Sequence, residues 1–224
     1  MSRRQEIDLL NQRHFPPLTA LPFKFDKNSL YCDANFIPQR RWYFLLEIHS
    51  LSFLLSLTLY GHDVRGNKAT VSLALPIGTD YTELNEKCRV GYTVAILCAK
   101  QQPFLDGTVG VKLNAKTLST MTVIPTTLVD FIHISRPMKY INTCSVCGKP
   151  AGHVCRKCGM PFCDPACLRE VWVLRHKAQC PAAAVIHFNE WTCEDVANGT
   201  TLRDHGRDLI ITKSVTWPLL DLKI

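Results

Sequence analysis

Residues 144–180 have the sequence CSVCGKPAGHVCRKCGMPFCDPACLREVWVLRHKAQC, which contains seven of the protein's eleven cysteines. We call this stretch the cysteine-rich segment. Its cysteines and one histidine fall into four closely spaced pairs: Cys144 and Cys147, Cys155 and Cys158, Cys163 and Cys167, and His176 and Cys180. Eight ligands of this kind predict two tetrahedral zinc sites. Because each site then has four protein ligands and no position for water, the pattern indicates structural rather than catalytic zinc.

The spacing within each pair explains how it can hold a metal ion. A Cys-x2-Cys pair fits a tight turn, and Gly148 and Gly159 directly follow the two pairs with this spacing. The other two pairs are four residues apart, so on a helix each pair shares one face. These spacings permit both a sequential and a crossed assignment of the pairs to the two sites.

Disulfide bonds are the main alternative use for these cysteines. No apolar stretch typical of a secretory signal follows Met1, so we expect an intracellular protein of the nucleus or cytoplasm, where disulfides are rare. Paired cysteines in that setting favour metal binding. His153 would break the pairing as a ninth ligand and is interpreted as a loop histidine. The unpaired Cys32, Cys88 and Cys98 are expected to be buried thiols.

The cysteine-rich segment resembles the MYND zinc finger. The family pattern of two Cys-x2-Cys pairs is followed here by Phe162 before the Cys-x3-Cys pair, by Trp172, and by Lys177 after the ligand histidine. The resemblance covers residues 144–180, about a sixth of the chain. It implies two zinc ions held in the crossed arrangement, in which the first and third pairs share one ion and the second and fourth pairs share the other.

Two departures from the family pattern affect what the resemblance implies. Eight residues separate Cys167 from His176 where seven are usual, so we expect an extra residue in a turn between two short helices. In peptide-binding members, a glutamine after the third pair and the tryptophan four residues later form a groove, but here Leu168 replaces the glutamine. The candidate partner-binding residues are therefore Trp172, Leu168 and Arg169. The alternative for Trp172 is a packing role over the zinc sites.

Composition describes an ordinary globular protein, with 224 residues, 46% hydrophobic and 20% charged. The net charge is +7, and residues 144–180 are the most basic region, with six basic and two acidic side chains. A basic face suits an acidic partner or nucleic acid, although such a face is often only solvated. The apolar stretch 42–60 includes Glu47 and His49, which are costly inside a bilayer, and its apolar residues alternate with polar ones. We therefore predict one long strand and no membrane partner.

The chain before the cysteine-rich segment is expected to be β-rich. Prolines make residues 1–40 an irregular arm that wraps the domain formed by residues 41–135. The long strand ending near Tyr60 should form a hairpin with 69–75, and 80–89 a short helix or loop. Alternation and turn residues predict further strands at 91–99, 109–113, 121–124 and 131–134.

The expected fold is mainly β with a small zinc-bound α module: a closed or nearly closed N-terminal antiparallel β-barrel, similar to an OB-type barrel, followed by a two-zinc MYND finger. The aromatic residues Phe44, Tyr60, Tyr92 and Phe104 are expected in its core rather than on a base-stacking surface. A short basic linker, 134–143, should let the cysteine-rich segment pack against the barrel. Pro181 should end the last helix, and the extension 181–224 offers one more strand near 209–218.

These features favour a non-enzymatic module that binds a protein or peptide partner. MYND fingers also occur beside SET methyltransferase domains, but the chain lacks the asparagine-histidine and cysteine-rich segments of those domains. It also lacks His-Glu-x-x-His, Gly-x-Ser-x-Gly and phosphate-loop motifs. The alternative function is nucleic-acid binding through the OB-like barrel and the basic finger.

Overall fold

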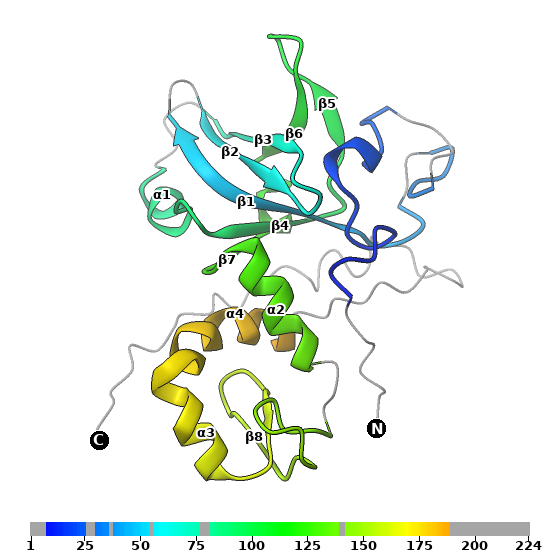
Figure 1. Cartoon of the computed structure of the whole chain (residues 1–224). Coiled ribbons are helices and arrows are strands. Elements are labelled where there is room, and N and C mark those ends of the chain that lie inside the picture. The colour runs from blue at the N-terminus through cyan, green and yellow to red at the C-terminus, as the bar shows by residue number, and fades with distance from the viewer. Residues whose placement is uncertain are drawn as a thin grey trace.

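A computed structural model describes residues 8–25, 30–35, 38–53, 56–76, 81–138 and 142–188. The large sheet forms one end of the molecule, and the cysteine-rich segment with α3 and α4 forms the other, with α2 between them (Figure 1). The strands are β1 (Tyr43–Ser52), β2 (Leu57–Asp63), β3 (Lys68–Ala74), β4 (Thr93–Leu97), β5 (Gln101–Pro103), β6 (Val109–Asn114), β7 (Met121–Ile124), β8 (His153–Val154) and β9 (Pro161–Phe162). The helices are α1 (Thr82–Lys87), α2 (Leu128–Met138), α3 (Pro165–Val171) and α4 (Lys177–Phe188), with 3-10 turns η1 (Leu18–Ala20) and η2 (Leu118–Thr120) and the π-helical turn η3 (Trp172–His176).

Seven strands form the large sheet in the order β5-β6-β3-β2-β1-β4-β7, which confirms a mainly β fold. The sheet is not purely antiparallel, because β3 and β6 run parallel. It is also not a closed barrel, since no strand pairing joins β5 to β7 within the described residues. However, β5 begins soon after β4 ends, although four strands lie between them in the sheet order. The sheet must therefore curl until its two ends approach each other.

The predicted long strand from 42 to 60 is wrong, because β1 and β2 are separate strands that pair antiparallel. Leu57 and Leu59 are buried in the core, whereas Phe53, which continues the same alternation, is 49% exposed. The alternation of apolar and polar residues continued across the reversal, and no glycine or proline marked it. The predicted hairpin with the next strand is confirmed by the pairing of β2 and β3.

A buried carboxylate joins the β2–β3 turn to the N-terminal residues. Asp63 is 3% exposed and accepts hydrogen bonds from the backbone N–H groups of Arg65 (2.8 Å) and Asn67 (3.0 Å) in the turn. It also accepts the N–H of Leu18 at 2.8 Å. Because three backbone donors converge on it, this carboxylate fixes η1 against the edge of the hairpin.

The outward face of the sheet carries one aromatic side chain that we expected in the core. Phe44 is fully buried, and Tyr92 and Phe104 are partly buried, but Tyr60 is 42% exposed. The expectation is wrong for Tyr60 because strand alternation directs its neighbours Leu59 and Gly61 inward and its own side chain outward. Cys32 and Cys88 are buried, as expected, whereas Cys98 is only partly buried. Burial raises the pKa of Cys88 to about 11.

The segment 131–134, predicted as a strand, and the start of the predicted linker belong to α2. Thr127 and Asp130 cap this helix reciprocally: the Thr127 hydroxyl accepts the N–H of Asp130 (3.1 Å) and donates to its carboxylate (2.9 Å). The buried residues Leu128, Phe131 and Ile134 recur every three positions along one helical face. In so short a stretch the apolar residues fit either period, and tertiary packing decides for the helix.

The helical part of the cysteine-rich segment differs from expectation in two ways. We expected an extra residue in a turn between two helices, but α3, η3 and α4 follow one another without a break. A π-helical turn holds one more residue than an α-helical turn, so η3 accommodates the insertion. Pro181 lies inside α4 instead of ending it. The next two residues, Ala182 and Ala183, are completely buried, and this packing offsets the lost backbone hydrogen bond.

The cysteine-rich segment shares a hydrophobic core with the sheet, as expected from the short connection. One cluster contains Tyr43 and Leu45 of β1, Phe131 of α2, and Phe162 of β9 together with several of the cysteines. Helix α2 also packs against α4. None of the described helices is both long and apolar enough to cross a bilayer. The proposed strand at 209–218 lies outside the described residues.

Candidate metal centre and partner groove

The first group of donor atoms contains the sulfurs of the first and third cysteine pairs. The Sγ atoms of Cys144, Cys147, Cys163 and Cys167 all lie within 4.8 Å of one another. Cys147 is 3.6 Å from Cys163 and 3.9 Å from Cys167, and the latter two are 3.3 Å apart. A tetrahedral zinc site with bonds near 2.3 Å has sulfurs about 3.8 Å apart, whereas a disulfide needs about 2.05 Å. The spacing fits a shared metal ion.

The second group is more deeply buried and includes the histidine. Its donors come from Cys155, Cys158, His176 and Cys180, and all four residues are buried. The sulfurs of Cys155 and Cys180 are 4.0 Å apart, and the Cys158 sulfur is 3.7 Å from Nε2 of His176. Soft thiolates with an imidazole in a compact tetrahedral set suit zinc among the common metals. Both groups would provide four protein ligands, which is the arrangement of a structural site.

The two groups decide which pairs belong together. Each combines pairs that are not consecutive in the sequence: the first with the third, and the second with the fourth. This is the crossed arrangement that the resemblance implied and that spacing left open. His153, which we interpreted as a loop histidine, belongs to neither group and lies exposed in β8.

Local backbone structure positions the ligands. Gly148 and Gly159 adopt left-handed conformations with φ of 72° and 71°, and their N–H groups donate to the carbonyls of Cys144 (3.0 Å) and Cys155 (2.7 Å). Both Cys-x2-Cys pairs are therefore in tight turns, as their glycines predicted. At the start of α3, the Asp164 carboxylate accepts the N–H of Cys167 at 2.8 Å. This N-cap begins the helix that presents the third pair.

Hydrogen bonding prepares the buried group for a cation. The bond from the Cys158 thiol lowers the pKa of Cys180 to about 4, although burial opposes this shift, and His176 lowers it further. The same bond raises the pKa of Cys158. The negative charge of this pair is therefore favoured on Cys180, and a bound metal ion would displace the proton that Cys158 retains.

A surface groove of about 340 Å³ lies between the β8–β9 hairpin and α3. Leu168 and Trp172, two of the predicted partner-binding residues, line it. The Trp172 ring also lies 5.4 Å from the His176 ring, centroid to centroid. Trp172 thus both packs over a metal ligand and faces the groove, so the two interpretations of this residue are compatible.

Arg169, the third predicted residue, is exposed on α3 but is not among the residues that line the groove. Val171, its neighbour, is buried in the core. Three further groove residues, which the sequence did not predict, line the other wall: Val154, Arg156 and Lys157. The only sequence signal for them was the two consecutive basic residues inside the second Cys-x2-Cys pair.

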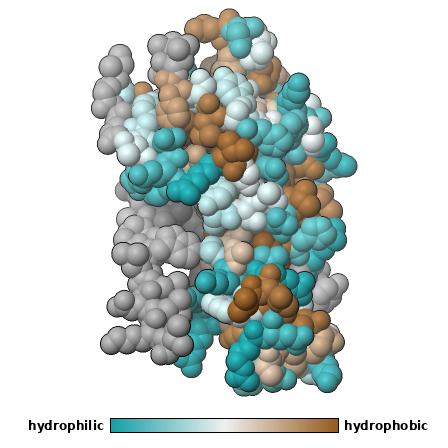
Figure 2. Space-filling view, turned by 60° about the vertical axis from the view of Figure 1, so that its left-hand side comes forward, coloured by the Kyte–Doolittle hydropathy of each residue, from teal (hydrophilic) through white to brown (hydrophobic). Residues whose placement is uncertain are grey.

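Apolar side chains are exposed among hydrophilic ones on the half of the molecule that holds the cysteine-rich segment (Figure 2). Val154 in β8 is 59% exposed, and Val173 and Leu174 in η3 are 83% and 79% exposed. The groove therefore lies in a surface that combines apolar and basic groups.

Comparisons with known proteins provide no family assignment. No family model matches the chain, and no curated protein matches it. Among solved structures, a chain in the crystal structure of the S. pombe Stn1-Ten1 complex is similar, with 14% sequence identity and a TM-score of 0.31. The similarity covers 47% of this chain and 73% of that chain. A TM-score this low carries no argument about function.

Proposed function

We propose that this protein is a non-enzymatic adaptor of the MYND type, acting in the nucleus or cytoplasm. Two structural zinc ions would hold the cysteine-rich segment in shape, and the groove between β8 and α3 would bind a peptide of a partner protein. The two donor groups with zinc-like spacing support the metal-binding part of this proposal. Neither group leaves a ligand position for a substrate or water, which favours a structural role.

The contact between Trp172 and His176 is the main support for peptide binding in the groove. Because His176 is a candidate metal ligand, the metal site fixes one side of the tryptophan while its other side is available to a partner. Leu168 provides a further apolar wall, and Arg156 and Lys157 are exposed basic residues along the opposite wall. The chemistry fits an extended peptide with an apolar side chain next to acidic residues.

A pull-down comparison tests this proposal. Trp172→Ala should lose partners that the wild-type protein captures, with peptide affinity falling by about 30-fold or more, the effect of losing about 2 kcal/mol at a hot-spot aromatic residue. Arg169→Ala, on the same helix but outside the groove, is the matched control and should retain them. Both variants must contain two equivalents of zinc.

A second variant tests the groove without removing the Trp172 ring that packs on the candidate metal ligand His176. Arg156→Glu changes an exposed groove residue without removing the aromatic packing, and should weaken the capture of acidic peptides. Unchanged binding by both groove variants would refute peptide binding at this groove.

Nucleic-acid binding is a second candidate, and the sheet favours it. Strands β1, β2 and β3 are consecutive neighbours, β3 is parallel to β6, and β5 follows β4, an order similar to that of an OB-type barrel. The face of the second and third strands, which binds oligonucleotides in such barrels, presents exposed Tyr60 and Lys68 here. Binding to single-stranded DNA that falls steeply with added salt, and that Tyr60→Ala weakens, would support this candidate.

A further inference from the structure

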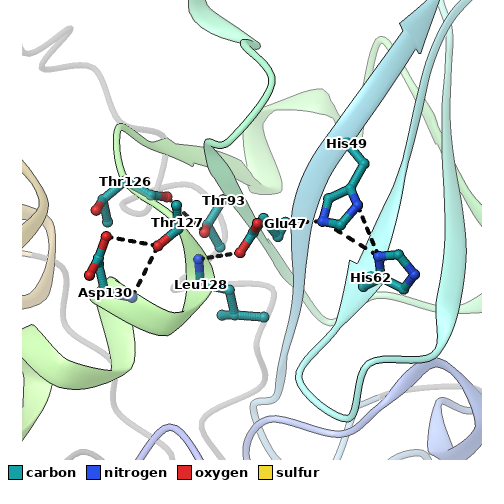
Figure 3. A network of polar contacts seen from close by, with 8 residues as sticks. All are labelled: Glu47, His49, His62, Thr93, Thr126, Thr127, Leu128 and Asp130. Atoms are coloured by element: carbon teal, nitrogen blue, oxygen red, sulfur yellow. Dashed lines mark hydrogen bonds and ion pairs between the residues drawn. The ribbon is translucent and has the colours of Figure 1, made fainter.

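A third cluster of metal-binding side chains lies outside the cysteine-rich segment, on the sheet where β1 pairs with β2. Glu47 and His62 are directly opposite each other in the two strands, and His49 follows two residues after Glu47. The His49 ring lies between the Glu47 carboxylate and the His62 ring (Figure 3). The side chain of His49 is 48% exposed and that of Glu47 is 21% exposed, so an ion from solvent can reach them.

The distances from His49 to each of its two neighbours fit a shared ion. Nε2 of His49 lies 3.4 Å from Nδ1 of His62 and 3.4 Å from Oε1 of Glu47. Two ligands at about 2.0–2.1 Å from a tetrahedral ion are separated by about 3.3–3.4 Å. Nδ1 of His62 also lies 3.1 Å from Nδ1 of His49, so binding all three donors to one ion requires the His62 side chain to rotate toward Glu47. Two imidazoles and a carboxylate form a common ligand set for zinc and leave a position for water.

The backbone at this place is built for a close approach of the two strands. The β1–β2 register shifts between Ile48 and Ser50, so His49 is the additional residue of a β-bulge. Gly61, the partner of Ile48, lies so near β1 that a Cβ atom on it would be 1.7 Å from the carbonyl oxygen of Glu47. Only glycine fits there, and the bulge that it permits holds His49 beside its two neighbours.

Glu47 also links this cluster to the rest of the protein. Its second carboxylate oxygen, Oε2, accepts the backbone N–H of Leu128 at 2.8 Å, at the first residue of α2. The carboxylate is therefore held in place with Oε1 directed at His49, as Figure 3 shows. Because α2 packs against α4, this hydrogen bond connects the cluster to the helix that carries Cys180.

We propose that Glu47, His49 and His62 bind a third divalent transition-metal ion, of the zinc type, that exchanges with solvent. This site is independent of the two cysteine-rich groups and of the peptide-binding proposal. Glu47 would bind the ion through Oε1 while Oε2 continues to accept the N–H of Leu128. The backbone amide of Leu128 therefore reports on metal occupancy.

Cobalt titration of the untagged full chain, loaded with two equivalents of zinc, tests the proposal. One further equivalent of Co²⁺ should bind without the sulfur-to-cobalt charge-transfer absorption that a cysteine site produces. Its paramagnetism should broaden the backbone amide resonance of Leu128. His62→Gln should weaken Co²⁺ binding by at least the roughly 10- to 100-fold that losing an outer-shell partner costs.

The controls separate this site from the cysteine-rich groups and from folding defects. His133→Gln changes an exposed histidine of α2 outside the cluster and should leave Co²⁺ binding unchanged. His49→Gln alters the most exposed of the three side chains and provides a second variant if His62→Gln fails to fold. The proposal is overturned if no third equivalent binds, if cobalt enters only by displacing zinc from cysteines, or if both histidine variants bind cobalt like the wild type.

Discussion

Replacing Cys155 or Cys163 by serine distinguishes the crossed arrangement from a sequential one, because the two arrangements assign these residues to different sites. In the structure, Cys163 belongs to the all-sulfur group and Cys155 belongs to the group with His176. In a sequential arrangement their assignments would be reversed. The sulfur of Cys163 lies 3.6 Å from that of Cys147 and the sulfur of Cys155 lies 4.0 Å from that of Cys180, as sulfurs on a common ion would.

The effect of each substitution should be large. Binding of one structural zinc contributes on the order of 10 kcal/mol of coupled folding free energy, and a site with three strong ligands loses much of it. Each variant should therefore retain one tightly bound zinc ion in place of two. Cys163→Ser should keep the site with three sulfurs and one nitrogen, and Cys155→Ser should keep the site with four sulfurs.

Elemental analysis measures the zinc content, and cobalt substitution identifies the remaining site. With Co²⁺ in place of zinc, charge-transfer absorption increases with the number of thiolate ligands, so Cys155→Ser should absorb more per bound ion than Cys163→Ser. NMR resonances of the His176 ring should be perturbed by cobalt in Cys163→Ser only. The opposite pattern would refute the crossed arrangement, and wild-type protein with well under two equivalents of zinc would refute the metal centre itself.

Two further predictions concern the helix that connects the sheet to the cysteine-rich segment. Glu47→Ala removes the carboxylate that accepts the N–H of Leu128, and should lower the free energy of unfolding, measured in urea, by about 0.5–2 kcal/mol. Glu47→Gln keeps an acceptor oxygen and should lower it less. Equal stability of the wild type and both variants would contradict this prediction. Phe131→Ala leaves a cavity at a fully buried position in the shared core and should lower the free energy of unfolding by about 3–5 kcal/mol. Val129→Ala, on the exposed face of α2, should change it by no more than about 0.5 kcal/mol. A Phe131→Ala variant as stable as Val129→Ala would show that the cluster is not packed as described.

The candidate metal ligands were predictable because their signal is local. A Cys-x2-Cys turn needs only its two sulfurs and the glycine that follows, and Gly148 and Gly159 adopt the left-handed conformations that such turns require. The same holds for the hairpin of β2 and β3, whose turn residues lie within a few positions of each other. Local spacing therefore identified eight candidate ligands and several strands without knowledge of the fold.

The errors lie where two structures fit the same local pattern. The segment around Phe131 is apolar at intervals that suit either a strand or a helix, and only its packing beside α4 decides for the helix. The break between β1 and β2 has no glycine or proline to mark it. Pro181 would normally end a helix, but the burial of Ala182 and Ala183 keeps α4 intact beyond it.

The sequence by itself determined the number and kind of candidate metal ligands, the turns that hold them and the mainly β character of the first half. Tertiary structure decided which candidate ligand pairs lie together, how the sheet is ordered, and that Val154 and Lys157 line one groove with Trp172. The physical reason is the range of the forces involved. Turn geometry and alternation act between residues a few positions apart, whereas the pairing of distant segments depends on the burial of a shared core that no single segment encodes.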